Sequence, residues 1–201
     1  MCFINHTHKI CFIANARTSS TSCYLNLENN INKNDDYISN INESPNKYHM
    51  SVKNIFNKYP IIKNYYKFCF VRNPYTRFIS SWLEFKNKGH SWASELFEYN
   101  TFKDFCLNFS NTEISKDIHF LPLYKQITID NIIYVDYIAK FENIEEEYKF
   151  LSNKLNYKFD INVRERPTNI SSQFDEYYDK ETKNIIYNFY KTDFEIFNYD
   201  K

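Results

Sequence analysis

The chain has 201 residues, a length that suits one globular domain, predicted over residues 1–201, which buries roughly two thirds of its surface without disulfide or metal staples. Its single glycine, Gly89, excludes a dinucleotide-binding GxGxxG fingerprint, a Walker A loop and collagen-like repeats. The formal net charge is zero, but residues 1–90 carry 12 Lys and Arg against 5 Asp and Glu, so an anionic ligand is expected in that half.

The first predicted elements are a strand and the helix that follows it. The apolar run at residues 10–14 predicts a buried strand, and the polar turn at 15–22 opens a helix. This start also resembles a secretory signal peptide, but an apolar stretch of about five residues is shorter than the usual core of about 7–15, so a strand is favoured. Residues 28–47, rich in Asn, Asp and Ser, predict a long surface connection.

A second strand and helix follow. Apolar residues at helical spacing predict a helix over Ser51–Tyr59, and YKFCFV at Tyr66–Val71 predicts another buried strand. Asn73 is a candidate N-cap, with Pro74 at the first helical position. This helix is expected to end at Gly89, which tolerates a left-handed C-cap.

The second half continues the alternation of strands and helices. Residues 93–109 predict one or two helices, and Ile132–Ile138 (IIYVDYI) predicts a third strand buried on both faces. A helix is expected from Phe141 to Leu155, and a terminal amphipathic helix over Asp179–Phe197. The sequence therefore predicts a three-layer α/β domain with a central parallel sheet flanked by helices.

The turn at residues 15–22 has the composition of an oxyanion site. It follows a strand, opens a helix, and offers Arg17 followed by five hydroxyl residues. The N–H groups at a helix N-terminus bind phosphate or sulfate, and a guanidinium group matches the geometry of oxyanions. The alternative is a Ser/Thr-rich N-cap beside a solvated arginine.

A second candidate site follows the strand Tyr66–Val71. Arg72 stands at the carboxyl end of this strand, where α/β sheets bind ligands, and Ser80 lies about two turns into the next helix. Both side chains are candidates for holding one phosphate. The alternative is an Arg72 that forms a structural ion pair and a Ser80 that serves as a small packing residue.

These segments together resemble the sulfotransferases that use PAPS (3′-phosphoadenosine 5′-phosphosulfate), in particular the carbohydrate type, sulfotransferase family 2. Arg17–Ser22 (RTSSTS) is similar to the family's loop, K-T-G-G-T-S or R-[ST]-G-[ST]-[ST], which holds the 5′-phosphosulfate. Phe70–Ser80 matches F-V-R-N-P-x-x-R-x-x-S, whose first Arg and Ser hold the 3′-phosphate. Phe141–Asn143 resembles the family's R-F-E-N element, and 175–199 resembles its C-terminal pattern.

The resemblance implies a P-loop-like fold and a sulfuryl transfer from PAPS to an acceptor hydroxyl, expected on a carbohydrate, with 3′,5′-ADP as the product and no metal. Arg17 would also act in catalysis, by stabilising the charge that grows on the departing nucleotide. The cofactor-binding residues that the resemblance implies are Arg17, Thr18, Ser19, Ser20, Thr21, Ser22, Arg72 and Ser80.

The acceptor hydroxyl needs a general base, and the segment 47–51 resembles the family region that supplies a catalytic histidine. His49 is therefore the expected base, since an ordinary histidine pKa of about 6.5 suits this task at neutral pH. Glu84 and His119 are the alternatives. His6 and His8 form an HxH pair without further apparent metal ligands.

The chain departs from the family pattern at several positions. Ser19 and Ser20 replace the two loop glycines, Leu123 stands where a Gln is expected after His119, and Asn198 replaces a Gly. These departures favour, as an alternative function, a non-catalytic nucleotide- or partner-binding module with the same fold. A P-loop kinase is a further alternative, which the missing glycines and loop lysine disfavour.

Five cysteines without CxxC spacing predict neither a zinc site nor a disulfide framework, and Cys11 and Cys69 are expected to be buried. They indicate a reducing compartment, and no apolar run reaches membrane-spanning length, so a cytoplasmic protein is expected. We expect a glycan or other hydroxyl-bearing partner, and neither nucleic acid nor membrane. Residues 164–171 are either a polar loop or a segment that closes over the cofactor.

Overall fold

The computed structural model describes residues 2–39, 49–89, 91–163 and 174–201. The chain divides into two compact units, each built from two stretches of sequence. The sheet unit comprises Met1–Val71 and Leu123–Arg166, and the helical unit comprises Arg72–Pro122 and Pro167–Lys201. The single domain expected over residues 1–201 stays a prediction.

The sheet unit is built on a five-stranded sheet with the strand order β3-β1-β2-β4-β7. β2 pairs with β4 and β4 with β7 in parallel, whereas β1 pairs antiparallel with both β2 and β3. The strands are β1 (Cys2–Asn5), β2 (Ile10–Ile13), β3 (Tyr37–Ser39), β4 (Tyr66–Val71) and β7 (Tyr137–Lys140).

The sheet is therefore mixed rather than wholly parallel, which corrects the prediction. The physical reason is the turn at residues 6–9, which joins β1 to β2 and is too short for the crossover that a parallel pair needs. The expected strand at residues 10–14 is present as β2 and has a partner on both sides. β3 lies within the segment expected to be a surface connection.

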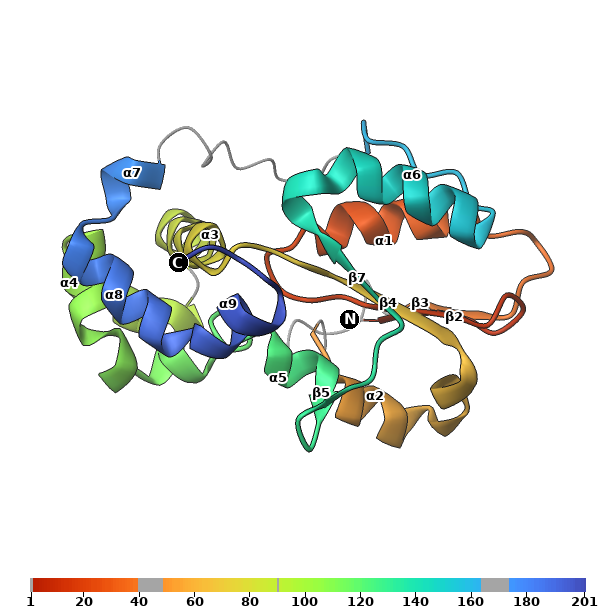
Figure 1. Ribbon diagram of the computed structural model, residues 1–201, viewed down its shortest axis with the longest axis horizontal. Coiled ribbons are helices and arrows are strands. Elements are labelled where there is room, and N and C mark those ends of the chain that lie inside the picture. Colours follow the sequence, from red (N-terminus) through yellow and green to blue (C-terminus); the bar gives the residue numbers. More distant parts are fainter. Residues whose placement is uncertain (1, 40–48, 90, 164–173) are drawn as a thin grey trace. The chain divides into compact units, whose positions relative to one another are not determined.

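Helices cover both faces of this sheet, so the three layers are present in the sheet unit. In Figure 1, α1 (Ser20–Glu28) and α6 (Ile144–Leu155) lie on one face, and α2 (Val52–Lys58) and α5 (Tyr124–Ile127) on the other. Two 3-10 turns, η2 (Pro60–Asn64) and η6 (Phe141–Asn143), precede β4 and α6.

The core of the sheet unit follows from the two-residue period of the strands. Phe12 of β2 packs against Phe68 of β4, with ring centroids 5.1 Å apart, and Phe70 packs edge-on against Tyr148 of α6. Leu27 of α1 belongs to the same buried cluster. The phenylalanines of the strands are thus buried under α1 and α6. The loop between β2 and α1 follows directly from this packed sheet.

The predicted strand at Ile132–Ile138 is wrong in its first half. Ile132 and Ile133 form β6, which pairs with β5 (Thr128–Ile129) in a separate hairpin, and both isoleucines are exposed. Asp130 and Asn131 connect the two strands with φ angles of 50° and 64°. A two-residue hairpin turn with positive φ at both central residues matches the twist of the two flanking strands. Asp and Asn tolerate a positive φ better than most residues do. The sheet strand, β7, begins only at Tyr137.

The helical unit surrounds a core of aromatic rings. Phe78 of α3 (Pro74–Lys88) packs against Phe102, Phe105, Phe109 and Phe120, with centroid distances between 4.9 and 5.7 Å. The other described helices of this unit are α4 (Phe102–Asn108), α7 (Phe174–Tyr177), α8 (Lys180–Phe189) and α9 (Lys191–Ile196). Its 3-10 turns are η3 (Ser91–Glu98), η4 (Phe109–Asn111) and η5 (Glu113–Lys116).

The predicted caps of α3 are confirmed, whereas the predicted terminal helix is divided. The Asn73 side chain accepts a hydrogen bond from the N–H of Tyr75, and Gly89 ends α3 with a φ of 62°. The helix expected over Asp179–Phe197 breaks at Tyr190, which separates α8 from α9. The Tyr190 hydroxyl donates to the Phe120 carbonyl, so this ring is buried in the aromatic core.

All five cysteines are free and buried, as Cys11 and Cys69 were expected to be. Burial raises the pKa of the Cys69 thiol to about 12 and that of Cys11 well above its usual value. These thiols are therefore protonated at neutral pH and do not act as nucleophiles.

Across the residues with a described structure, no helix is both long enough and apolar enough to cross a membrane.

Candidate functional site

The loop between β2 and α1 has an unusual backbone. Arg17 and Ser19 have φ angles of 63° and 62°, while Thr18 between them keeps a negative φ. Alternation of left-handed and right-handed residues is the backbone pattern of anion-binding nests, so the positive φ angles at Arg17 and Ser19 make this loop a candidate nest. The loop leads into the first turn of α1, where further N–H groups lack partners within the helix.

Ser19 adopts the conformation for which glycine is normally needed. It is the N-cap of α1, with φ 62° and ψ 26°, and its side chain makes no capping hydrogen bond. An L-residue in this left-handed region costs about 1–2 kcal/mol relative to the right-handed one. The loop therefore keeps a glycine-like bend although serine occupies the position.

Two hydrogen bonds fix the loop on the sheet. The Thr18 hydroxyl donates to the Asn15 carbonyl over 3.0 Å, and the Asn15 side-chain amide donates to the Phe70 carbonyl of β4 over 2.9 Å. Asn15 and Thr18 are fully buried. The loop is thus tied to the carboxyl ends of two neighbouring parallel strands.

The local groups of this loop suit an oxyanion such as a sulfate or phosphate ester. The nest supplies backbone donors, Arg17 supplies a guanidinium group, and Ser20, Thr21 and Ser22 supply hydroxyls on the first turn of α1. Backbone N–H groups, hydroxyl donors and a fixed cation are the groups that a sulfate or phosphate ester needs. Arg17, Ser19 and Thr21 are half-buried, so part of the loop surface is accessible.

His49 lies at the start of this loop. Its Nδ1 atom is 2.7 Å from the carbonyl oxygen of Ala14, the residue before Asn15. A carbonyl oxygen only accepts, so Nδ1 carries the proton and Nε2 bears the lone pair in the neutral ring. The structure therefore brings together two predicted site elements that are distant in sequence, and it orients the histidine in the tautomer of a base.

Arg72 and Ser80 belong to the helical unit. Arg72 follows β4 directly, and its Nε donates to the Thr76 hydroxyl over 3.2 Å. Thr76 and Ser80 are four residues apart in α3 and therefore share a face of that helix. The Arg72 side chain thus lies along the face that carries Ser80, and both residues are buried. His49 and Arg17 lie in the sheet unit, so each pair is assembled within its own unit.

The alternative bases, Glu84 and His119, both lie in the helical unit. Asp117 accepts hydrogen bonds at one carboxylate oxygen from the His119 backbone N–H (2.9 Å) and from Nδ1 of its ring (2.7 Å). The His119 carbonyl accepts from Arg77 and from Ser81. His119 is therefore built into the framework of the helical unit through its backbone as well as its ring.

Arg77, the second arginine of the Phe70–Ser80 motif, has a structural role. It is fully buried, its Nη2 donates to the carbonyls of His119 and Leu121 over 3.1 and 2.6 Å, and its guanidinium group lies 5.6 Å from the centroid of the Tyr190 ring. A buried guanidinium group needs such acceptors to offset its loss of hydration. Of the two arginines in this motif, Arg77 therefore stabilises the fold.

Sequence reasoning missed the residues that hold the site residues in place. Thr76 orients Arg72, and its position four residues after the arginine was an available signal. Asn15 and the Ala14 carbonyl fix the loop and His49 through contacts between distant segments, for which the sequence carries no local signal. The 164–171 segment lies outside the described residues.

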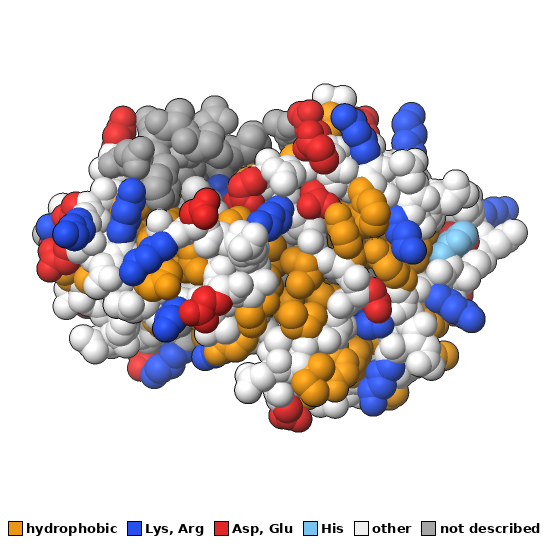
Figure 2. All heavy atoms as spheres, in the orientation of Figure 1, with side chains coloured by type: hydrophobic (Ala, Val, Ile, Leu, Met, Phe, Trp, Pro, Cys, Tyr) orange, Lys and Arg blue, Asp and Glu red, His pale blue; other side chains and the backbone are white. Residues whose placement is uncertain are grey.

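Charges of both signs are spread over the face drawn in Figure 2, with hydrophobic side chains exposed between them. On this face the two signs of charge are interspersed. Among the residues that the structure describes, no group of three or more His, Cys, Asp or Glu side chains is placed to hold a metal ion.

A family model for a sulfotransferase family matches residues 1–200. No curated protein and no solved structure matches the chain. The family match covers both the Arg17–Ser22 loop and the Phe70–Ser80 motif, and it extends over almost the entire sequence. The chain therefore belongs to this sulfotransferase family, as the two motifs indicated.

Proposed function

We propose that the protein transfers a sulfuryl group from PAPS to a hydroxyl of a carbohydrate. The observation that carries this proposal is the hydrogen bond between His49 and the Ala14 carbonyl, which brings a base in the correct tautomer to the start of the Arg17 loop. Transfer of a charged group to a hydroxyl needs both a base for the proton and donors for the anion.

The nucleotide would be held at two places. Arg17 and the backbone N–H groups of the loop bind the 5′ end, and Arg72 and Ser80 bind the 3′-phosphate. Arg72 suits this task because its guanidinium group is already oriented by Thr76, so little side-chain freedom is lost on binding. When bound, PAPS supplies a sulfuryl group activated as a phosphosulfate anhydride.

His49 and Arg17 divide the chemical work. Nε2 of His49 accepts the proton of the acceptor hydroxyl, while Nδ1 keeps its proton on the Ala14 carbonyl, whose partial negative charge stabilises the imidazolium ion. Arg17 offsets the negative charge that builds on the 5′-phosphate as the sulfuryl group departs.

Calorimetric titration of 3′,5′-ADP and 5′-AMP into the full chain tests the cofactor assignment. We expect 3′,5′-ADP to bind at least about tenfold more tightly, because hydrogen bonds to charged groups contribute about 1.5–3 kcal/mol. Arg72→Ala should remove this difference and leave 5′-AMP binding unchanged, whereas Arg17→Ala should weaken both nucleotides. Equal binding of the two nucleotides by the unmodified protein would contradict the proposal.

The non-catalytic alternative has its own signature. A protein that binds 3′,5′-ADP with this preference, yet transfers no sulfuryl group to any of a broad panel of sugars, would be a nucleotide-binding module with a sulfotransferase fold. The glycine-like backbone at Ser19 disfavours this alternative, since the substitution leaves the shape of the loop intact.

A further inference from the structure

The backbone pairing of β2 with β4 stops just before the loop that leads to α1. Ile13 and Cys69 are the last paired residues of the two strands. At the start of the pair the Tyr66 N–H donates to the Lys9 carbonyl, and every second residue of a strand faces the same neighbour. The Phe70 carbonyl therefore points toward β2, where it would accept the next backbone hydrogen bond.

The Asn15 side chain takes the place of that backbone hydrogen bond. Its Nδ2 atom donates to the Phe70 carbonyl over 2.9 Å, although β2 itself ends at Ile13. The side chain thus continues the ladder by one step after the main chain has left it. Asn15 is fully buried, which strengthens this hydrogen bond relative to one in water.

The two peptide groups that flank the Asn15 Cα atom both take part in the candidate site. The peptide group before it contains the Ala14 carbonyl, which lies 2.7 Å from Nδ1 of His49. The peptide group after it contains the Asn15 carbonyl, which accepts the Thr18 hydroxyl over 3.0 Å. Because each peptide group is planar, fixing the Cα atom between them restricts the direction of both carbonyls. The anchor at Asn15 therefore sets the acceptor that His49 needs.

The oxygen of the Asn15 amide is unfavourable for stability. Among the described residues, no donor reaches this buried Oδ1 atom. An unsatisfied buried acceptor has a free-energy cost that an apolar side chain would avoid. Stability alone therefore does not account for an asparagine at this position, whereas the need for its N–H donor at the Phe70 carbonyl does.

We infer that Asn15 is a positioning residue, whose side-chain amide replaces the last ladder hydrogen bond and thereby orients the Ala14 carbonyl that holds His49. Asn15 acts through the histidine rather than on the reacting atoms. The consequence for sulfuryl transfer rests on the proposed function, whereas the effect on the His49 ring does not, so both are measured.

NMR of the isotope-labelled full chain at about pH 8, above the ordinary histidine pKa of about 6.5, reports which ring nitrogen of His49 carries the proton. The unmodified protein should show a protonated Nδ1 and an unprotonated Nε2, since the Ala14 carbonyl only accepts. In Asn15→Ala the ring should lose this preference and populate both neutral tautomers. A merely structural role for Asn15 would leave the tautomer unchanged.

Asn5→Ala is the matched control within the sheet unit. Asn5 is also fully buried, but it pairs with Ile10 at the opposite end of β2. Its side chain is better satisfied than that of Asn15, because it donates two hydrogen bonds and accepts one. Asn5→Ala should therefore lower the Tm more than Asn15→Ala does, yet leave the His49 signals unchanged.

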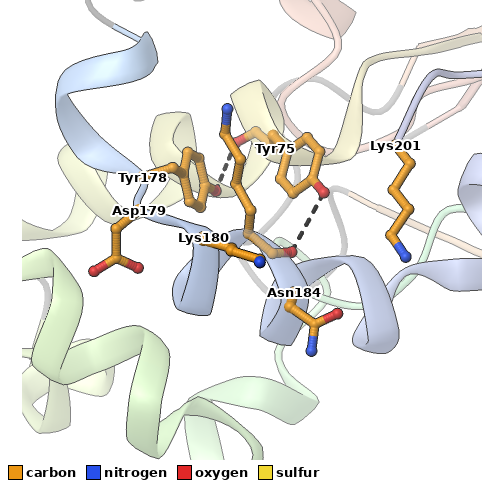
Figure 3. Close-up of a pocket in the computed structure, with 7 residues that line it drawn as sticks. Tyr75, Tyr178, Asp179, Lys180, Asn184 and Lys201 are labelled. Carbon is orange, nitrogen blue, oxygen red and sulfur yellow. Dashed lines mark hydrogen bonds between the residues drawn. The ribbon is translucent and has the colours of Figure 1, made fainter.

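A second control removes a buried side-chain donor from a backbone carbonyl in the helical unit. The Tyr178 hydroxyl donates to the Tyr75 carbonyl over 3.0 Å, beside the pocket drawn in Figure 3. Both tyrosines are almost completely buried, and their ring centroids lie 5.3 Å apart. Tyr178→Phe keeps the ring and removes the hydroxyl, so it should leave the His49 signals unchanged.

The rate of sulfuryl transfer is the second readout. Asn15→Ala should lower kcat by at least about tenfold, because a small misplacement of a catalytic group slows a reaction strongly. Asn5→Ala and Tyr178→Phe should stay within severalfold of the unmodified protein. If Asn15→Ala fails to fold, Asn15→Ser, which keeps a small polar side chain without the amide, should change the His49 signals in the same way.

Three results would overturn the inference: unchanged His49 signals in Asn15→Ala, the same change of these signals in Asn5→Ala, or an unchanged kcat in Asn15→Ala. An unmodified protein that transfers no sulfuryl group would instead refute the proposed function. The His49 signals would then still decide whether Asn15 positions the histidine.

Discussion

Replacing Ser19 by glycine should stabilise the protein, although it removes a side chain. Ser19 has a left-handed backbone that costs an L-residue about 1–2 kcal/mol, and glycine avoids this cost. Glycine in turn lowers the free energy of unfolding by about 0.5–1 kcal/mol, because it has greater conformational freedom in the unfolded chain. The serine hydroxyl makes no capping bond, so its loss adds little. The net expectation is a gain of about 0.5–1 kcal/mol.

The matched control is Ser20→Gly, one residue further on. Ser20 is the first residue of α1 and has helical geometry, so glycine there should cost up to about 1 kcal/mol. Urea titration and thermal unfolding of both variants measure the difference. For a chain of this length, Ser19→Gly should raise the Tm by about 1–4 °C, and Ser20→Gly should lower it by a similar amount.

The sign of the effect at Ser19 decides whether the reasoning is correct. If Ser19→Gly destabilises the protein as much as Ser20→Gly does, the loop does not contain the strained bend described above. Because glycine preserves the nest, affinity for 3′,5′-ADP should be equal or higher in Ser19→Gly. A large loss of nucleotide affinity would show that the serine hydroxyl itself is the binding group.

Substitutions at three further positions test the fold and its pH dependence. Gly89→Ala should cost about 1 kcal/mol in urea unfolding, because φ is +62° although a Cβ would meet no atom within 4 Å; no loss would argue against a left-handed C-cap. Asn73→Ala should cost about 1 kcal/mol by losing the N-cap of α3, and Asn73→Asp should restore most of it, a result that a purely steric role would not give. Asp179→Asn should lower the urea midpoint at pH 7, because the hydrogen bond from Lys103 depresses the pKa of Asp179 in the folded state. A depressed pKa stabilises the fold above the unfolded value of about 3.9, so the gap to the unmodified protein should begin to shrink below pH 4 and close only as the pH falls through the lowered folded-state pKa; a gap that does not shrink at all between pH 4 and pH 2 would assign the effect to capping instead.

Elements with local signals could be predicted from the sequence, whereas those that depend on distant partners could not. The ends of α3 were predictable because Asn73, Pro74 and Gly89 act through their own backbone and side-chain chemistry. β1 was missed because its four residues carry no distinctive local pattern. Only the pairing of β1 with β2 identifies it as a strand. At Ile132 the apolar run itself was misleading, since the decisive signal was the preceding Asp-Asn turn.

The same distinction applies to the candidate site. The Arg17 loop was predictable because a strand, a hydroxyl-rich turn and a helix start are contiguous in sequence. The approach of His49 to Ala14 joins distant segments, and only the family resemblance indicated it. The structural role of Arg77 could not be predicted either, because its acceptors at residues 119 and 121 are brought to it by the fold.

The most direct test of the account is sulfuryl transfer from radiolabelled PAPS to a panel of glycans, measured for the unmodified protein, for His49→Gln and for His119→Gln. The account predicts label transfer to at least one glycan, a loss of about 10²–10⁴-fold in kcat for His49→Gln, and a rate within severalfold of the unmodified protein for His119→Gln. Full activity in His49→Gln together with an inactive but folded His119→Gln would contradict it.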